Sequence, residues 1–197
     1  MLKKITILIS AIILLSVIVW FISDRYFTNT SEPLNSTKEG WVTYSPDKYN
    51  FLIKYPKYFT IQSNEYEDSI RGKRVATLES NPEGYIIDIY IANRSLNGYK
   101  IIDQPSGVNF EFNADLNEWI KNHPQPEEVE IYHYNNITYY LYSYGEFGKI
   151  DDAIISSPDN NYVITIVFSK HYDEYGNWVG PKEELEVKDI VNTLNFY

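Results

Sequence analysis

The sequence predicts an α+β domain that is built on a mostly antiparallel sheet and preceded by one transmembrane helix. Two nearly continuous apolar runs, 85–91 and 162–168, are typical of central strands covered on both faces. The segment 130–142 has the pattern of a hairpin, and two further stretches carry apolar residues at helical spacing. Many strands with few helices indicate the α+β class.

The N-terminal segment predicts a membrane anchor. Residues 5–22 contain no charged residue and follow Lys3 and Lys4. As a helix they would span about 27 Å at 1.5 Å per residue, close to the roughly 30 Å hydrocarbon core of a bilayer. A cleaved signal peptide is the alternative, but the run is long for one and no small-residue cleavage motif follows it. We therefore expect an uncleaved anchor.

The two lysines also predict the orientation of the chain. The positive-inside rule leaves residues 1–4 in the cytoplasm and exports the remainder. Residues 23–40 include a Ser-, Thr-, Asn- and Pro-rich stretch, which indicates a flexible tether. Residues 41–197 would then form an extracytoplasmic domain on the outer face of a bacterial cytoplasmic membrane.

Composition excludes several classes of partner and site. All 27 acidic residues and 15 of the 17 basic residues follow residue 23, so the exported part carries 15 − 27 = −12. Such a charge disfavours nucleic acid and anionic lipid surfaces as partners. The sequence has no cysteine, which excludes disulfides, thiolate metal sites and a cysteine nucleophile. Its 19 tyrosines suit both wide sheet faces and binding surfaces.

The first exported strand is predicted at the segment FLIKYPKYF, residues 51–59. Phe51, Ile53 and Tyr55 alternate with other residues, so they share one face of a strand and can enter the core. Pro56 lacks a backbone donor and ends the pairing. Phe59 would pin the returning chain against the same core.

A hairpin is predicted across 130–142. Asn135 and Asn136 form its turn, because Asn tolerates the positive φ that a two-residue hairpin turn needs. This register places Tyr132 opposite Tyr139 and Glu130 opposite Leu141. A further turn, at 156–161, leads into the second apolar run.

Two helices are predicted. Asn113 can cap a helix over 114–122, in which Leu116, Trp119 and Ile120 have the spacing of one buried stripe. The second helix covers 182–194 and starts after Gly180-Pro181 with acidic residues in its first turn. Its apolar stripe consists of Val187, Ile190, Val191 and Leu194.

The two ends of the exported part resemble a known family. The opening Trp41-x-x-Tyr44, followed by Phe51-x-Ile53-x-Tyr55-Pro56-x-x-Phe59, is similar to the start of PsbP-like domains. The ending Thr193-Leu194-Asn195-Phe196 is similar to the C-terminal motif of these domains. The resemblance implies an α/β/α sandwich around an antiparallel sheet over residues 41–197. The best-known member of the family is an extrinsic subunit of photosystem II, but no metal-binding or partner-binding residue of the family can be matched to this sequence.

Catalytic signals are sparse in this sequence. It lacks a Gly-x-Ser-x-Gly elbow, and His123, His133 and His171 lie far apart without metal-ligand spacing. Asp88 interrupts an apolar strand, so it either points to water or is a partly buried acid of the kind used in catalysis. We therefore predict no cofactor and no catalytic residue.

The remaining candidates are acidic loops and aromatic side chains. Asp151-Asp152 and Asp173-Glu174 could supply oxygen ligands to Ca²⁺, or could belong to a solvated face. Tyrosines on one hairpin face could form a platform for sugars or a peptide, or could simply pack in the sheet. Trp178, between Gly176 and Gly180, is the best candidate for an exposed aromatic. The possible ligand or partner contacts are therefore Trp178, Tyr140, Tyr142, Tyr144, Asp151, Asp152 and Asp173.

Together these features predict a membrane-tethered, non-enzymatic interaction domain whose partner is a protein or a wall polymer. The alternative is a divalent-cation or small-ligand binding module that uses the acidic loops. An enzyme acting through Asp88 or the acids at 151–152 is the third hypothesis.

Overall fold

The computed structural model describes residues 40–63, 65–81, 84–102, 109–121, 129–144, 150–172, 178, 180 and 184–197. Among these residues no helix is long and apolar enough to cross a membrane. The anchor expected at 5–22 and the tether lie outside the described residues, apart from Gly40.

The elements are β1 Trp41–Tyr44, β2 Phe51–Pro56, β3 Phe59–Gln62, β4 Tyr66–Asp68, β5 Gly72–Ser80, β6 Tyr85–Ala92, β7 Lys100–Ile102, β8 Asn109–Asn113, β9 Glu118–Lys121, β10 Glu130–Tyr134, β11 Ile137–Tyr144, β12 Ile150–Ser156, β13 Val163–Lys170, α2 Val187–Val191 and β14 Asn195–Phe196.

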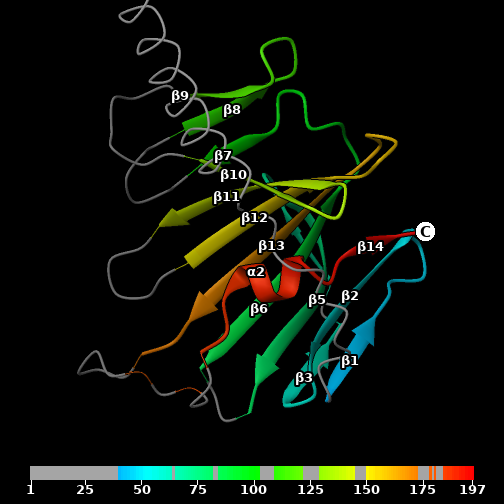
Figure 1. The fold of residues 1–197 in the computed structure, drawn as a ribbon, viewed down its shortest axis with the longest axis vertical. Coiled ribbons are helices and arrows are strands. Elements are labelled where there is room, and N and C mark those ends of the chain that lie inside the picture. Colours follow the sequence, from blue (N-terminus) through cyan, green and yellow to red (C-terminus); the bar gives the residue numbers. More distant parts are fainter. Residues whose placement is uncertain are drawn as a thin grey trace, which may run out of the picture. The chain divides into compact units, whose positions relative to one another are not determined.

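Three antiparallel sheets make up the described fold (Figure 1). The largest has eight strands in the order β10-β11-β12-β13-β6-β5-β3, with β4 also paired to β5. The predicted central strands are confirmed, since β6 and β13 pair with each other in the middle of this sheet. The two smaller sheets are β1-β2-β14 and β7-β8-β9.

Each face of the eight-stranded sheet has its own core. On one face, side chains of β2 and α2 pack against those of the central strands, including Ile89 and Ile166, which are fully buried. On the other face, β7, β8 and the loop after β6 cover residues such as Tyr142 and Ile154. Figure 1 shows α2 in front of the large sheet, with β7, β8 and β9 grouped at one end. The fold is therefore mostly antiparallel β.

The start and end of the domain agree with the sequence prediction. Phe51, Ile53 and Tyr55 are all buried in the first core, and Pro56 is the last residue of β2. Phe59, in β3, is buried in the same core. Three residues of the predicted C-terminal stripe, Val187, Ile190 and Val191, are buried in α2 as expected, and Leu194 is also buried but follows the helix.

The predicted helix over 114–122 is wrong. Its described part forms the β8–β9 hairpin, whose turn contains Asn117 at a φ of 53°. Asn113 accepts backbone hydrogen bonds from Asp115 and Leu116, as a helix cap would, but the chain then turns back. Leu116 and Ile120 are exposed. The interaction of Asn113 with the amides of Asp115 and Leu116 is therefore an Asx turn rather than a helix cap.

The C-terminal helix is shorter than predicted. Residues 184–186 are described as non-helical, and α2 begins at Val187. Glu186 and Asp189 form a capping box at its start. In the described part of the chain α2 is the one helix, so the helical layers of the expected α/β/α sandwich are reduced there to five residues.

The hairpin at 130–142 is confirmed in turn and register. Asn135 and Asn136 have φ values of 45° and 66°, and Tyr132 lies opposite Tyr139. We expect Asn136→Ala to lower the free energy of unfolding by about 1 kcal/mol, because a left-handed backbone strains a side chain that lacks the amide of Asn. Asn136→Gly should keep the stability near that of the wild type. Chemical denaturation of the full-length chain would measure both, and equal losses in the two variants would contradict this explanation.

Candidate functional site

Asp151 and Asp152 do not lie in a solvated loop, contrary to expectation. Both are in β12, between β11 and β13, and both are buried. As consecutive residues of a strand they point to opposite faces of the sheet. Ser143 donates a hydrogen bond to Asp151, whereas Asp152 accepts bonds from Arg71. These two carboxylates therefore cannot share one metal ion.

The tyrosines of β11 do not form an exposed platform. Tyr140 and Tyr142 are buried in the second core, with their ring centroids 5.3 Å from Phe112 and 5.2 Å from Phe110 respectively. Tyr144 is half-buried on the same face, where its ring stacks on Tyr142. Sheet packing therefore accounts for Tyr140 and Tyr142, and Tyr144 belongs to the polar cluster described below.

Trp178 is half-buried rather than exposed. Its ring lies 4.6 Å from that of Tyr85 and 5.6 Å from that of Tyr172, and it packs against the first core. Asp173 lies outside the described residues. His133 is exposed and forms a hydrogen bond with Thr138, and His171 is also exposed. Among the described residues no group of three or more His, Asp or Glu side chains could hold a metal ion.

Asp88, the acid that interrupts the apolar strand β6, is partly buried and engaged by neighbours. Thr77 donates a hydrogen bond of 2.5 Å to its Oδ1, and the Arg74 guanidinium lies 3.4 Å from the same atom. The carboxylate therefore holds two neighbouring side chains in place. It is not presented to an open cavity as a free acid.

These contacts lead to a cluster that the sequence reasoning missed. The chain contains four arginines, and three of them gather on the face of the large sheet that carries Asp88 and Asp152. We call this cluster the arginine face. It consists of Arg71, Arg74, Arg94, Asp68, Asp88, Asp152, Tyr66, Tyr90, Tyr99 and Tyr144.

Arg71 occupies the middle of the arginine face. Its Nε and Nη2 donate to Oδ2 of Asp152 at 3.0 and 2.7 Å, and Nη2 also donates to the Tyr144 hydroxyl at 3.0 Å. Burial raises the pKa of the Asp152 carboxyl, and the Arg71 guanidinium acts against that shift. Asp152 is 3% exposed, so this is a buried ion pair that joins β12 to the turn after β4.

The turn before β5 aims Arg71 at this partner. Oδ1 of Asp68 accepts the backbone amides of Ile70 and Arg71 at 2.8 and 2.7 Å, which fixes the turn. Gly72 follows with a φ of +85°, where a Cβ would meet the carbonyl oxygen of Ile91 at 2.5 Å. Only glycine allows the chain to pass β6 so closely in this conformation.

Arg74 and Arg94 each lie over a tyrosine ring. Arg74 is 5.5 Å from the centroid of Tyr66, and Arg94 is 4.8 Å from that of Tyr99. Burial raises the pKa of Tyr99 to about 12, although its hydroxyl is 2.6 Å from that of Thr165. Such a hydroxyl stays protonated at neutral pH, so Tyr99 provides a fixed, neutral ring.

The arginine face has three guanidinium and three carboxylate groups, so its formal charge is 3 − 3 = 0. Each carboxylate already accepts hydrogen bonds from the protein, Asp68 from backbone amides and the other two from arginine or threonine side chains. The arrangement is suited to positioning guanidinium groups and poorly suited to acid–base catalysis. The one feature of the sequence that could have indicated the arginine face is the segment Arg71-Gly72-Lys73-Arg74, in which a glycine stands at the start of a strand.

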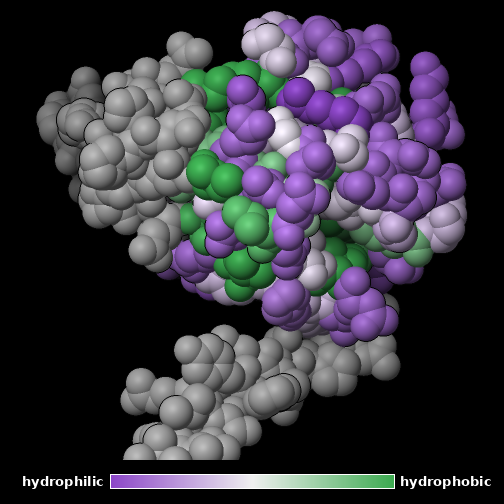
Figure 2. Space-filling model, turned by 90° about the horizontal axis from the view of Figure 1, so that it is seen from above, coloured by the Kyte–Doolittle hydropathy of each residue, from purple (hydrophilic) through white to green (hydrophobic). Residues whose placement is uncertain are grey.

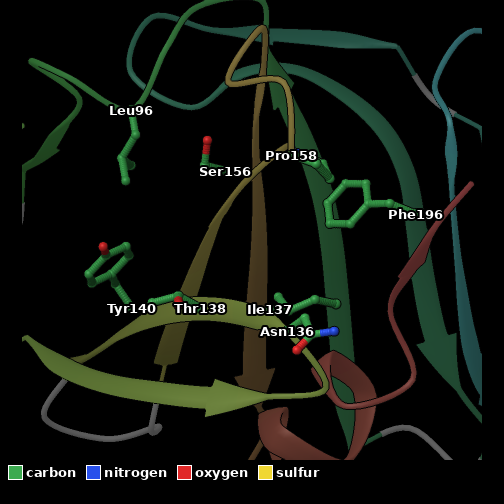
Figure 3. A pocket seen from close by; sticks show the side chains of 8 residues that line it. All are labelled: Leu96, Asn136, Ile137, Thr138, Tyr140, Ser156, Pro158 and Phe196. Carbon is green, nitrogen blue, oxygen red and sulfur yellow. The ribbon is translucent and has the colours of Figure 1, made fainter.

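A small cleft lies elsewhere, at the end of the β10–β11 hairpin (Figure 3). Its volume is about 170 Å³, below the roughly 300–1,000 Å³ of most ligand pockets. Thr138 and Ser156 line it, but their hydroxyls are already bonded to His133 and Asn160 respectively. The described residues that line the cleft are uncharged: Leu96, Asn136, Ile137, Thr138, Tyr140, Ser156, Pro158 and Phe196.

In the part of the chain that the structure describes, exposed apolar side chains do not define a further site. The view in Figure 2 shows hydrophobic residues gathering towards the middle of one face and hydrophilic residues on its right side. The large exposed hydrophobic side chains are spread over separate elements, from β1 to the C-terminus: Val42, Ile61, Tyr66, Ile86, Leu116, Ile120, Ile131 and Tyr197. Scattered single residues of this kind are normal on a protein surface.

No protein-family model and no curated protein matches this sequence. Among solved structures, the chain is similar to the solution structure of cyanobacterial PsbP (CyanoP) from Synechocystis sp. PCC 6803. The TM-score is 0.46 and the identity 12%, over 84% of this chain and 99% of that chain. At this level the similarity carries no activity or partner. The described residues form a mostly antiparallel β domain whose fold is similar to that of PsbP.

Proposed function

We propose that the protein is a non-enzymatic binding domain, held on the outer face of a cytoplasmic membrane by residues 5–22, which presents the arginine face to a protein or a wall polymer. One observation carries this proposal: the three described arginines of an acidic protein lie together, beside tyrosines, on one sheet face. Arg and Tyr are the residue types most enriched in the energetically important parts of interfaces.

Accessibility supports a binding role for this face. Tyr66 is 55% exposed and lies beside the half-buried Arg74, and Arg94 is exposed. The pair of Arg71 and Asp152 ties the turn before β5, the strand that carries Arg74, to β12. An exposed rim over a rigid base is the arrangement that allows binding with little ordering of side chains.

The two alternatives receive less support. A cation module built on Asp151 and Asp152 would need both carboxylates to face one ion, but they lie on opposite faces of β12, and the other acidic pair, Asp173-Glu174, lies outside the described residues. An enzyme acting through Asp88 would need that carboxylate to be available, but it is paired with Arg74 and Thr77. The contacts of these acids are structural, so we favour the binding domain.

Site-specific photo-cross-linking in intact membranes tests this proposal. Tyr66 would be replaced by photo-reactive benzoylphenylalanine in the full-length chain. Ile131, which is 50% exposed on β10 at the other edge of the large sheet, serves as the matched control. We expect a discrete adduct from position 66 and none of that size from position 131. Equal adducts at both positions, or none at position 66, would refute the proposal.

A further inference from the structure

Arg94 differs from the other two arginines of the cluster in its charge partner. Arg71 forms ion pairs with Asp152 and Asp68, and Arg74 forms one with Asp88. Within the described part of the chain, Arg94 forms no ion pair with a carboxylate. Arg94 is therefore the arginine of this face that has no ion pair within the described part of the chain, although the face as a whole is formally neutral.

The guanidinium of Arg94 is nevertheless held in place from two sides. It lies over the Tyr99 ring, and its Nη2 donates to the carbonyl oxygen of Ile70. Tyr99 is itself almost fully buried and is bonded to Thr165. An exposed arginine would ordinarily sample many rotamers, and these contacts remove much of that freedom before a ligand arrives.

The remaining donors of Arg94 suit an oxyanion. A guanidinium has five N–H donors, and the bond to Ile70 uses one of them. Its planar fork matches the two oxygens of a carboxylate or a phosphate, and such bidentate contacts are among the strongest hydrogen bonds. The nearby acids Asp68, Asp88 and Asp152 are each engaged by the protein, which reduces their repulsion of an incoming anion.

We infer that Arg94 is the contact for an oxyanion group, a carboxylate or a phosphate, carried by the partner; this rests on the proposed function of the arginine face. The net charge of −10 gives no long-range attraction for an anion, so recognition depends on short-range geometry. Arg94 supplies the charge, Tyr99 fixes its plane, and Arg71 and Arg74 hold the surrounding strands.

Nuclear magnetic resonance of the full-length chain in neutral detergent micelles can test this inference. The sequence has four arginines, so the arginine Nε–Hε region contains four signals at most, and Arg94→Gln assigns one of them. Sodium phosphate and sodium acetate would be titrated separately against sodium chloride at constant ionic strength. The phosphate and acetate titrations identify which oxyanion is preferred.

We expect a saturating shift of the Arg94 signal with phosphate or acetate. The accompanying shifts of backbone amides around Ile70 and Tyr99 should disappear in Arg94→Gln. Lys57→Gln removes an exposed positive charge elsewhere and should leave the titration unchanged. Shifts that stay linear with concentration, or that persist in Arg94→Gln, would overturn the inference.

The cross-linking experiment separates this inference from the proposed function. If the adduct at position 66 forms and Arg94→Gln lowers its yield about tenfold, both the proposed binding function and the role of Arg94 as the oxyanion contact are supported. If the adduct forms and is unaffected by Arg94→Gln, the domain binds a partner but Arg94 is not its contact. If phosphate or acetate binds at Arg94 but position 66 gives no adduct, the oxyanion contact stands and the proposed function fails.

Discussion

Replacement of Arg71 by alanine is expected to lower the free energy of unfolding by about 3–5 kcal/mol, which is the usual cost of leaving a buried charge without its partner. The Asp152 carboxylate accepts two bonds from this guanidinium and is 3% exposed. Truncating the guanidinium would leave those two bonds unmade. Chemical denaturation of the full-length chain, followed by tryptophan fluorescence, would measure the loss.

Two controls make this result specific to the pair. Lys73→Ala removes a cation two residues away, whose ion pair with Glu65 lies at the surface, and should change stability little. The double replacement Arg71→Met with Asp152→Leu removes both charges and should recover most of the lost stability, because an apolar pair often substitutes well for a buried ion pair. If Arg71→Ala proved no less stable than Lys73→Ala, the proposed importance of the ion pair between Arg71 and Asp152 would be contradicted.

Gly72→Ala is expected to have the second large effect, a loss of about 2–5 kcal/mol. Two costs combine: a left-handed backbone strains any residue with a Cβ by about 1–2 kcal/mol, and overpacking adds about 1–3 kcal/mol. The new methyl group would meet the Ile91 carbonyl oxygen at 2.5 Å and the Cα of Ala92 at 2.8 Å. Strands β5 and β6 would have to separate locally.

Gly98→Ala isolates the first of these costs. Gly98 has a φ of +71°, but among the described residues its added Cβ would find a single atom within 4 Å, Oε1 of Glu111 at 3.8 Å. This variant should lose about 1–2 kcal/mol. The difference between the two variants therefore measures the close approach of β5 to β6, and equal losses would show that the approach relaxes at little cost. Urea denaturation of both full-length variants gives the comparison.

The parts of the fold that the sequence predicted correctly are those with local signals. The hairpin at 130–142 combines alternating large residues with two asparagines, and both asparagines adopt positive φ. The central strands carry nearly continuous apolar runs, and β2 carries an alternating one. In each case the residues that decide the structure are close together in the sequence.

The failed helix at 114–122 shows the limit of such signals. Three apolar residues at helical spacing and a possible capping Asn are compatible with a hairpin as well as with a helix. In the β8–β9 hairpin, Asn113 accepts hydrogen bonds from the amides of Asp115 and Leu116 in an Asx turn, as it would in a helix cap. Cross-strand pairing, such as that of Phe112 with Trp119, distinguishes the hairpin from the helix. That pairing depends on packing against Tyr140, which lies more than 20 residues further along the chain.

The arginine face could not be predicted for a related reason. Arg71 and Asp152 are 81 residues apart, and their contact requires that β12, β13, β6 and β5 lie side by side in the observed order. The sequence shows Asp151-Asp152 as an acidic pair, which usually marks a solvated loop. Its burial follows from the position of β12 between two strands, and sequence alone does not determine that position.

The small sheet β1-β2-β14 determines how late in synthesis the domain can complete its folding. Strand β2 has β1 on one side and β14 on the other, and the pairing of Phe51 with Phe196 joins residues 145 positions apart. During synthesis β2 must therefore wait for the last residues of the chain to emerge before its second neighbour exists. Contacts of such large sequence separation form slowly and late. A nascent chain that stops before residue 195 would leave one edge of β2 open to pairing with other chains.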